Sequence, residues 1–187
     1  MEQTNKIIQI LSLKNYLKEN YGNHYPFEII ELIIMMDYDF VKQISCGWNH
    51  NAFLTKFGKI FVWGKNDNGR LGLGNYKNQN TPQELNLSDV VSIYCGGCHT
   101  IALTKSGKIF VWGYNEYGQL GLGNYKNQNT PQELNLPDVA SIHCGGYHNI
   151  ALTKFGKIFV WGHNHYGQLG LGHNNDQYVP TELQLIE

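Results

Sequence analysis

Two groups of side chains in this 187-residue sequence have residue types and spacing that could do chemistry. Cys95 and Cys98 have the Cys-x-x-Cys spacing found in redox-active pairs and in zinc sites. His163, His165 and His173 lie close enough in the sequence to hold a metal ion between two loops. Whether either group acts chemically depends on how the surrounding chain is built.

The surrounding chain is built from copies. Tryptophan recurs with a period of 49 residues, at Trp63, Trp112 and Trp161. The stretch Leu71–Leu87 is repeated letter for letter at Leu120–Leu136. Three units therefore tile the sequence after residue 40, with bounds 41–89, 90–138 and 139–187. A catalytic site is assembled once from differing residues, whereas a structural module is copied, so the repetition favours structural roles.

Residues that recur in every unit are predicted to be architectural. One repeat position is always cysteine, for which we predict small buried thiols, and Cys98 has no second pair or flanking helical pattern. The histidines repeated once per unit would lie too far apart to share a metal, and we expect each to bond to neighbouring backbone: His50, His99 and His148. The repeated tryptophans are predicted to pack between units. For His163, His165 and His173 the alternative to metal binding is a solvated loop, and we predict no metal and no cofactor.

The local patterns within a unit predict β-strands. Val91, Ile93 and Cys95 alternate as one face of a strand, and Ser106-Gly107 is predicted to be a two-residue hairpin loop. Pro131 suits the start of a strand or an edge strand. About four short strands per unit indicate a β-propeller blade. The fold class is therefore an all-β repeat.

The segment CGGCHTIALTKSGKIFVWGYNEYGQLGLGN, from Cys95 to Asn124, resembles the repeat of the regulator of chromosome condensation family. The family hallmarks are a Gly-x-x-His-Thr-type turn, a Trp-Gly pair and a Gly-Gln-Leu-Gly-x-Gly loop. The resemblance covers Val41 to Glu187 and implies a seven-blade type of propeller. Three units would form an open segment of that ring, with two blade faces that another copy of the chain could cover.

The first 40 residues are predicted to form two short α-helices. Ile7, Ile10 and Leu11 have helical spacing, and Pro26 suits the first turn of a second helix that ends near Met36. The simpler interpretation is that these helices cap the first blade. Alternatively, the stretch YPFEIIELIIMMDYD, from Tyr25 to Asp39, resembles the opening of an F-box, which implies a cullin–RING ligase adaptor as partner.

Partner-binding residues are expected where the copies differ. Trp48 occupies a position that is glycine in the other two units, and the turn after each Trp-Gly pair differs in all three. These turns are expected to line one rim of the blades. The predicted partner-binding residues are Trp48, Lys65, Asp67, Tyr114, Glu116, His163 and His165.

The composition limits the remaining functions. The net charge is −1 and no basic stripe is present, which argues against nucleic-acid binding. The most apolar run, Phe27 to Met36, is too short to cross a membrane, and no signal peptide is recognised, so we expect a cytoplasmic or nuclear location.

The sequence contains no catalytic motif, because it has no serine or cysteine beside a positioned base, no paired carboxylates at a fixed spacing and no phosphate-binding glycine loop followed by lysine. We therefore predict a non-enzymatic protein-interaction module. The alternatives are a substrate adaptor of a cullin–RING ubiquitin ligase and, as the family resemblance implies, a guanine-nucleotide exchange factor for a small GTPase.

Overall fold

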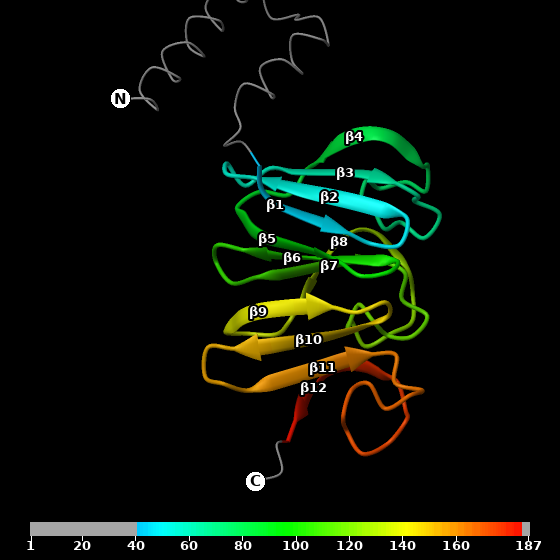
Figure 1. Ribbon diagram of the computed structural model, residues 1–187, viewed down its shortest axis with the longest axis vertical. Coiled ribbons are helices and arrows are strands. Elements are labelled where there is room, and N and C mark those ends of the chain that lie inside the picture. The colour runs from blue at the N-terminus through cyan, green and yellow to red at the C-terminus, as the bar shows by residue number, and fades with distance from the viewer. Residues whose placement is uncertain (1–40, 185–187) are drawn as a thin grey trace, which may run out of the picture. The chain divides into compact units, whose positions relative to one another are not determined.

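The computed structural model describes residues 41–184, which form three four-stranded antiparallel sheets arranged one after another (Figure 1). Each sheet follows the chain order of its strands, so each is an up-and-down blade. The first sheet contains β1 (Val41–Cys46), β2 (His50–Thr55), β3 (Ile60–Gly64) and β4 (Gln79–Leu85). The second contains β5 (Val90–Cys95), β6 (His99–Thr104), β7 (Ile109–Gly113) and β8 (Gln128–Leu134). The third contains β9 (Val139–Cys144), β10 (His148–Thr153), β11 (Ile158–Gly162) and β12 (Gln177–Leu183).

The predicted blade architecture is confirmed by these sheets. β1, β5 and β9 begin at the first residues of the three sequence units. The two helices predicted in residues 1–40, and the F-box-like interpretation of Tyr25 to Asp39, lie outside the described residues. Residues 41–184 contain no helix that could serve as a membrane span.

The hairpin between β6 and β7 differs in length from the prediction. Thr104 N donates to the Lys108 carbonyl oxygen at 2.9 Å, so the loop contains Lys105 as well as Ser106 and Gly107. Gly107 has a φ of 86°, as predicted for the glycine of this turn. In a three-residue hairpin loop, a tight turn is followed by one residue of positive φ, and here that residue is Gly107. The prediction of a two-residue loop was therefore wrong, but the predicted positive φ of Gly107 is confirmed.

The first strand of the second blade, β5, also departs from simple alternation. A β-bulge shifts the register between Val90 and Ser92, so Val90 joins Ile93 and Cys95 in one core. Val91 packs against the other core of the protein. The prediction that Val91 shares a face with Ile93 was wrong because one extra residue in a strand reverses the facing of its neighbour. Pro131 lies in β8, an edge strand, as predicted.

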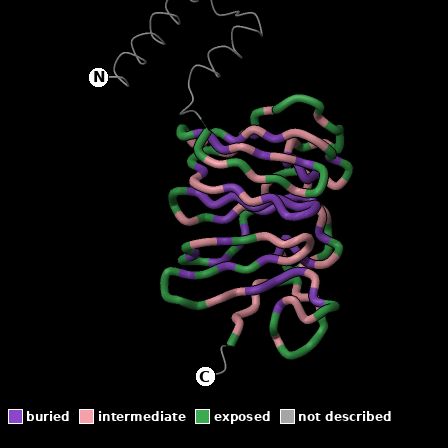
Figure 2. The backbone as a smooth tube through the Cα atoms, in the orientation of Figure 1, coloured by how far each residue is buried: buried purple, intermediate pink, exposed green. Residues whose placement is uncertain are grey.

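The hydrophobic core consists of two clusters, one at each junction between blades. In the first cluster, Leu54 and Val62 of the first blade meet Ile93 and Trp112 of the second. In the second cluster, residues of β6 and β7 meet residues of β9 to β11, including Trp161. The middle sheet therefore contributes to both cores, and every residue of β6 is buried (Figure 2).

The outer faces of the first and third blades are exposed among the described residues. Ile101 of the second blade is fully buried, whereas Ile150, its equivalent in the third blade, is 41% exposed. On the first blade Ile44 is 74% exposed, while its equivalent Ile93 is fully buried. The same side chain is thus buried or exposed according to whether a neighbouring blade covers it.

A polar network joins neighbouring blades beside the apolar clusters. His50 Nε2 donates to Thr100 Oγ1 at 2.9 Å, and His99 Nε2 donates to Asn149 Oδ1 at 2.7 Å. His50 and His99 are therefore architectural, as predicted, but they bond to side chains of the next blade, where backbone partners were expected. The third repeated histidine, His148, is only half buried. Thr100 lies in β6 and Asn149 in β10, so each reaches its histidine only because neighbouring blades pack together.

The repeated tryptophans complete this network. Trp112 Nε1 donates to the Arg70 carbonyl oxygen at 3.0 Å, and Trp161 Nε1 donates to the Gln119 carbonyl oxygen at 3.1 Å. Each ring thus buries its apolar surface and satisfies its only donor on the preceding blade. The predicted packing between blades is confirmed for Trp112 and Trp161, whereas Trp63 is only half buried and contacts Phe53 of its own blade.

The paired positions Ile101 and Ile150 test the contribution of a covered blade face. We expect Ile101→Ala to lower the free energy of unfolding by about 2–5 kcal/mol, because it leaves a cavity between two blades. Ile150→Ala should cost about 1 kcal/mol or less, because its side chain already contacts solvent. Urea denaturation of the full chain at low protein concentration measures both. Equal losses would show that another surface covers the third blade in solution.

The buried histidines predict a loss of stability in mild acid. Burial, aided by the charge of Arg70, lowers the pKa of His50 to about 3, and burial lowers the pKa of His99 to about 4. Below about pH 6.5 the unfolded chain therefore takes up protons that the folded chain excludes. Stability should fall by up to about 1.4 kcal/mol per pH unit for each histidine as the pH decreases from about 6.5 to 4.

Urea midpoints measured across this pH range check the expectation. His99→Gln keeps a side-chain donor near Asn149 but removes one titrating group, so its stability should depend less steeply on pH than that of the wild type. The same slope for both proteins would contradict a neutral, buried His99.

Candidate functional site

The turns that follow the Trp-Gly pairs are fixed by one buried asparagine each. Asn66 Oδ1 accepts a hydrogen bond from Leu71 N at 2.9 Å, and Asn66 Nδ2 donates to the Asn75 carbonyl oxygen at 2.8 Å. Asn115 and Asn164 make the equivalent bonds in the other blades. All three asparagines are fully buried. The middle residue of each turn is therefore structural, and only the flanking residues are available to a partner.

Trp48 lies in the turn between β1 and β2, and it contacts the equivalent turns of the next two blades at Gly97 and Gly146. Its backbone N donates to the Gly97 carbonyl oxygen at 3.2 Å, and Gly97 N donates to the Gly146 carbonyl oxygen at 2.9 Å. A Cβ atom on Gly97 would come within 2.8 Å of Trp48 Cε2, and one on Gly146 within 3.1 Å of Trp48 Cζ2. The tryptophan of the first copy thus requires the glycines of the other two, and its side chain remains 59% exposed.

Trp48 begins a continuous group of aromatic rings that spans the three blades. We call this group the aromatic rim surface, and it consists of Trp48, Tyr114, Tyr117, Tyr147, His163 and His165. The ring centroids of Trp48 and Tyr147 are 4.8 Å apart, and those of Tyr147 and Tyr117 are 5.1 Å apart. Tyr117 lies 4.6 Å from His163, which lies 4.4 Å from His165. Tyr114 contacts both Tyr117 and Tyr147.

Tyr114 and Tyr147 of this surface are neutral at physiological pH. Burial and the hydrogen bond to Glu116 raise the pKa of Tyr114 above its ordinary value. Burial also raises the pKa of Tyr147. Both phenols therefore keep their protons and can donate hydrogen bonds. The surface combines apolar ring area with a few polar groups, and Glu116 is exposed.

Lys65 and Asp67 form a separate, charged cluster on the first blade. Lys65 Nζ lies 3.0 Å from Asp67 Oδ2, and the buried Arg70 places Nη2 2.8 Å from Asp67 Oδ1. Burial opposes ionisation of Asp67, but the hydrogen bond from Lys65 and the charge of Arg70 outweigh it and lower the carboxyl pKa. The Asp67 carboxylate thus balances the charge of the buried Arg70, which stands where the other two copies have glutamine.

Sequence reasoning found part of the aromatic rim surface. The structure brings together Trp48, Tyr114, His163 and His165, with Glu116 beside Tyr114. Tyr117 and Tyr147 were missed. The position of Tyr147 differs in all three copies, and the position of Tyr117 is asparagine in the first copy, so both carry the signal that identified the other residues.

The described cysteines form no disulfide and belong to no described group that could hold a metal ion. Cys46, Cys95, Cys98 and Cys144 are all free. Burial raises the pKa of Cys95 to about 12, and burial also raises the pKa of Cys144. These thiols are therefore protonated and unreactive. The prediction of buried thiols was wrong for Cys46, which is exposed because none of the described residues covers the outer face of the first blade.

The three histidines considered as metal ligands do not form one group. His173 Nδ1 accepts a hydrogen bond from Asn175 N at 3.2 Å, within its own loop. His163 and His165 instead lie near Asp176, which was not identified from the sequence. These last three residues are the group in the described chain that could hold a metal ion.

The close approach of Trp48 to Gly97 can be tested by substitution. Gly97→Ala should lower the free energy of unfolding by about 1–3 kcal/mol, because the methyl group meets both the indole ring and the Gly146 carbonyl oxygen. Trp48→Ala removes only the indole contact and should restore part of that loss. A double-mutant cycle by urea denaturation should give a coupling of at least about 0.5 kcal/mol. Additive effects would contradict the geometry.

The chain is similar to proteins of one known family. A family model described as the RCC1-like domain matches residues 15–187. The human X-linked retinitis pigmentosa GTPase regulator is 42% identical over 52 residues, which cover 28% of this chain and 5% of that protein. The Arabidopsis thaliana ultraviolet-B receptor UVR8 is 42% identical over 43 residues, which cover 23% of this chain and 10% of the receptor.

Solved structures show the same relationship. Yeast RCC1 (Prp20), in its complex with Kap60, superposes with a TM-score of 0.70 at 26% identity, covering 78% of this chain and 38% of Prp20. Prp20p of Saccharomyces cerevisiae in a second structure gives the same TM-score and covers 39% of that chain. The matched region therefore spans less than half of each of these relatives. The agreement of the family model, the repeats and the blade geometry shows that this chain belongs to the RCC1-like domain family.

Proposed function

We propose that the chain is a non-enzymatic protein-interaction module that binds a partner protein through the aromatic rim surface. The observation that carries this proposal is the continuous contact of aromatic rings across three blades, at positions where the copies differ. If these residues served only the fold, the copies would be expected to carry the same residue types, as they do at the buried asparagines.

The residue types of the surface support a binding role. Tryptophan and tyrosine are enriched among the residues that dominate the energy of protein interfaces, since they bury a large area with few rotatable bonds. Trp48 is 59% exposed and Tyr166, which contacts His163, is 89% exposed. A partner could therefore bury substantial aromatic area here without the surface having to rearrange.

The surface is also held rigidly. The backbone bonds from Trp48 to Gly97 and from Gly97 to Gly146 join the turns between the first two strands of the three blades. Tyr147 is wedged among Trp48, Tyr114 and Tyr117. Because these rings are ordered before binding, less entropy is lost on association.

The chemistry of the surface indicates the kind of partner. Aromatic rings that carry hydroxyl and imidazole groups suit a partner segment with apolar or aromatic side chains and exposed carbonyl acceptors. The absence of a basic stripe from the sequence argues against a nucleic acid. Among the relatives, Prp20p has binding properties toward Gsp1p and histones, and its complex with Kap60 has been solved. We propose a protein partner inside the cell, in the cytoplasm or nucleus.

Guanine-nucleotide exchange is the second candidate, because a mouse RCC1-like G exchanging factor-like protein is 52% identical over 42 residues. Those residues cover 22% of this chain and 9% of the mouse protein. The ligase-adaptor alternative depends on Tyr25 to Asp39, outside the described residues. Self-association through the outer blade faces would use a different surface from the aromatic rim.

Substitution of the aromatic rim surface tests the proposal. The double variant Trp48→Ala/Tyr147→Ala should lose a partner that the wild-type full chain captures from cells that express it. The fold should persist, because Trp48 is exposed and Tyr147 is only half buried. Tyr76→Ala provides a matched control, since Tyr76 is 54% exposed and has no ring contact with the surface among the described residues. Captured proteins are compared quantitatively by mass spectrometry.

The identity of the captured proteins separates the alternatives. A partner lost by the double variant and kept by the Tyr76 control supports the proposed surface. A small GTPase as that partner would favour nucleotide exchange. Retention of every partner by the double variant, including a cullin–RING adaptor, would contradict a binding role for the aromatic rim surface.

A further inference from the structure

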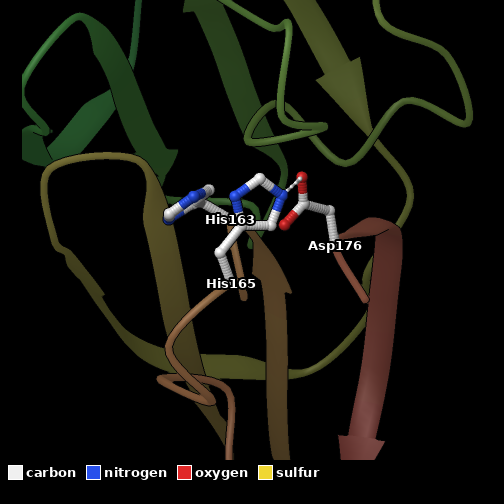
Figure 3. A group of neighbouring side chains, drawn as sticks. All are labelled: His163, His165 and Asp176. Atoms are coloured by element: carbon white, nitrogen blue, oxygen red, sulfur yellow. Dashed lines mark ion pairs between the residues drawn. The ribbon is translucent and has the colours of Figure 1, made fainter. Parts of the chain in front are cut away.

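We propose that His163, His165 and Asp176 form a binding site for a zinc-like divalent transition-metal ion in the third blade. One potential ligand atom from each residue lies within 4.8 Å of the others. His163 and His165 follow β11, and Asp176 immediately precedes β12, so two adjacent strands hold the group together. Figure 3 shows the His165 ring between His163 and the Asp176 carboxylate.

The geometry is close to that of a metal-binding site. His165 Nε2 and Asp176 Oδ2 are 3.5 Å apart. Ligand atoms about 2.0–2.1 Å from a tetrahedral zinc ion lie about 3.3–3.4 Å from each other. The ligand atoms all lie within 4.8 Å of one another, so the widest separation has to shorten by at most about 1.4 Å on binding. Because His165 and Asp176 are already near this spacing, the pair to be shortened includes His163, a loop residue that lies outside both core clusters.

The three ligand positions have these residue types only in the third copy. The first copy has Lys65, Asp67 and Asn78 at the equivalent positions. The second copy has Tyr114, Glu116 and Asn127. Two imidazoles and one carboxylate form the donor set of many catalytic zinc sites, whereas neither other combination does. The first two blades thus serve as internal controls for the third.

Asp176 differs most informatively from its equivalents in the other two copies, Asn78 and Asn127. Asn78 Oδ1 accepts a hydrogen bond from Asn66 N at 2.8 Å, and Asn127 Oδ1 accepts one from Asn115 N at 2.7 Å. Asp176 Oδ1 accepts the same bond from Asn164 N at 2.6 Å. The fold therefore needs only one oxygen at this position. The aspartate keeps that oxygen and adds Oδ2, the atom that lies near His165.

Gln168 holds His163 in place and must give way partly when a metal binds. Its Nε2 donates to His163 Nδ1 at 2.7 Å, while its Oε1 accepts a hydrogen bond from Tyr166 N at 3.0 Å. Coordination through Nδ1 displaces this bond, and coordination through Nε2 moves the ring proton to Nδ1. Either change replaces one neutral hydrogen bond with a bond to the metal, which is the stronger interaction.

Three protein ligands leave one tetrahedral position open. A water molecule can fill it, as in zinc sites that bind an exchangeable ligand. Because His163 and His165 belong to the aromatic rim surface, the ion would add positive charge at one end of that surface. Metal binding does not depend on the proposed partner, so the two proposals can fail separately.

Titration of the full chain with zinc chloride tests the site. All affinity tags are removed, and isothermal calorimetry at neutral pH measures the stoichiometry and the dissociation constant. We expect one ion per wild-type chain. His165→Gln and Asp176→Asn should each weaken binding at least about tenfold, since even loss of a residue behind a metal ligand costs about 10–100-fold.

Two controls make the result specific. His173→Gln removes the neighbouring histidine outside the group and should leave the affinity unchanged. Asp176→Asn restores the residue of the other two copies, so its melting temperature should match that of the wild type. Absorption of the cobalt-substituted protein should show nitrogen and oxygen ligation without thiolate charge-transfer bands, which excludes Cys46 as a ligand.

The proposal is overturned by any of three results. The wild-type chain fails to bind zinc, Asp176→Asn binds it as tightly as the wild type, or the cobalt spectrum shows thiolate ligation. Loss of binding in His165→Gln and Asp176→Asn, with retention in His173→Gln, supports the assignment.

Discussion

The contact between neighbouring blades is the constraint on which the rest of this structure depends. A single four-stranded sheet here has apolar residues on both faces, and it buries them only where another sheet lies against it. Ile101 is fully buried and its copy Ile150 is 41% exposed, although their local sequences are nearly the same. The buried histidines and tryptophans strengthen these junctions by bonding to the adjacent blade. Removing one blade would therefore destabilise the blade beside it, because the two share one core cluster.

The aromatic rim surface is a product of the same contact. Trp48 comes from the first blade, yet its ring lies over glycines of the second and third. Tyr147 of the third blade contacts Tyr114 and Tyr117 of the second. No single copy contains this surface, so its function depends on the array of blades. This also explains why near-identical copies can support a specific site: the shared residues build the scaffold, and the few that differ meet at one rim.

The buried asparagines show how the scaffold leaves room for chemistry. Asn66, Asn115 and Asn164 hold every turn with the same bonds, so the residues on either side can change without loss of the fold. The acceptor opposite them needs a single oxygen, which Asn78, Asn127 and Asp176 all provide. Because the structural bond uses only one terminal atom of the side chain, the other terminal atom can take a different role. The third blade uses this freedom to place a carboxylate beside two histidines.

Much of the fold could be predicted from the sequence, because the period of the tryptophans and the alternation within each unit are local properties. They determined the strands, the blade and the family, and they identified the positions at which the copies differ. The three-residue turn at Gly107 and the reversed facing of Val91 were decided by backbone register, which alternation alone does not fix. The approach of Tyr147 to Trp48 and of Asp176 to His165 was decided by tertiary structure. These residues come from different blades or from opposite ends of a loop, and only the packed sheets bring their side chains within reach of one another.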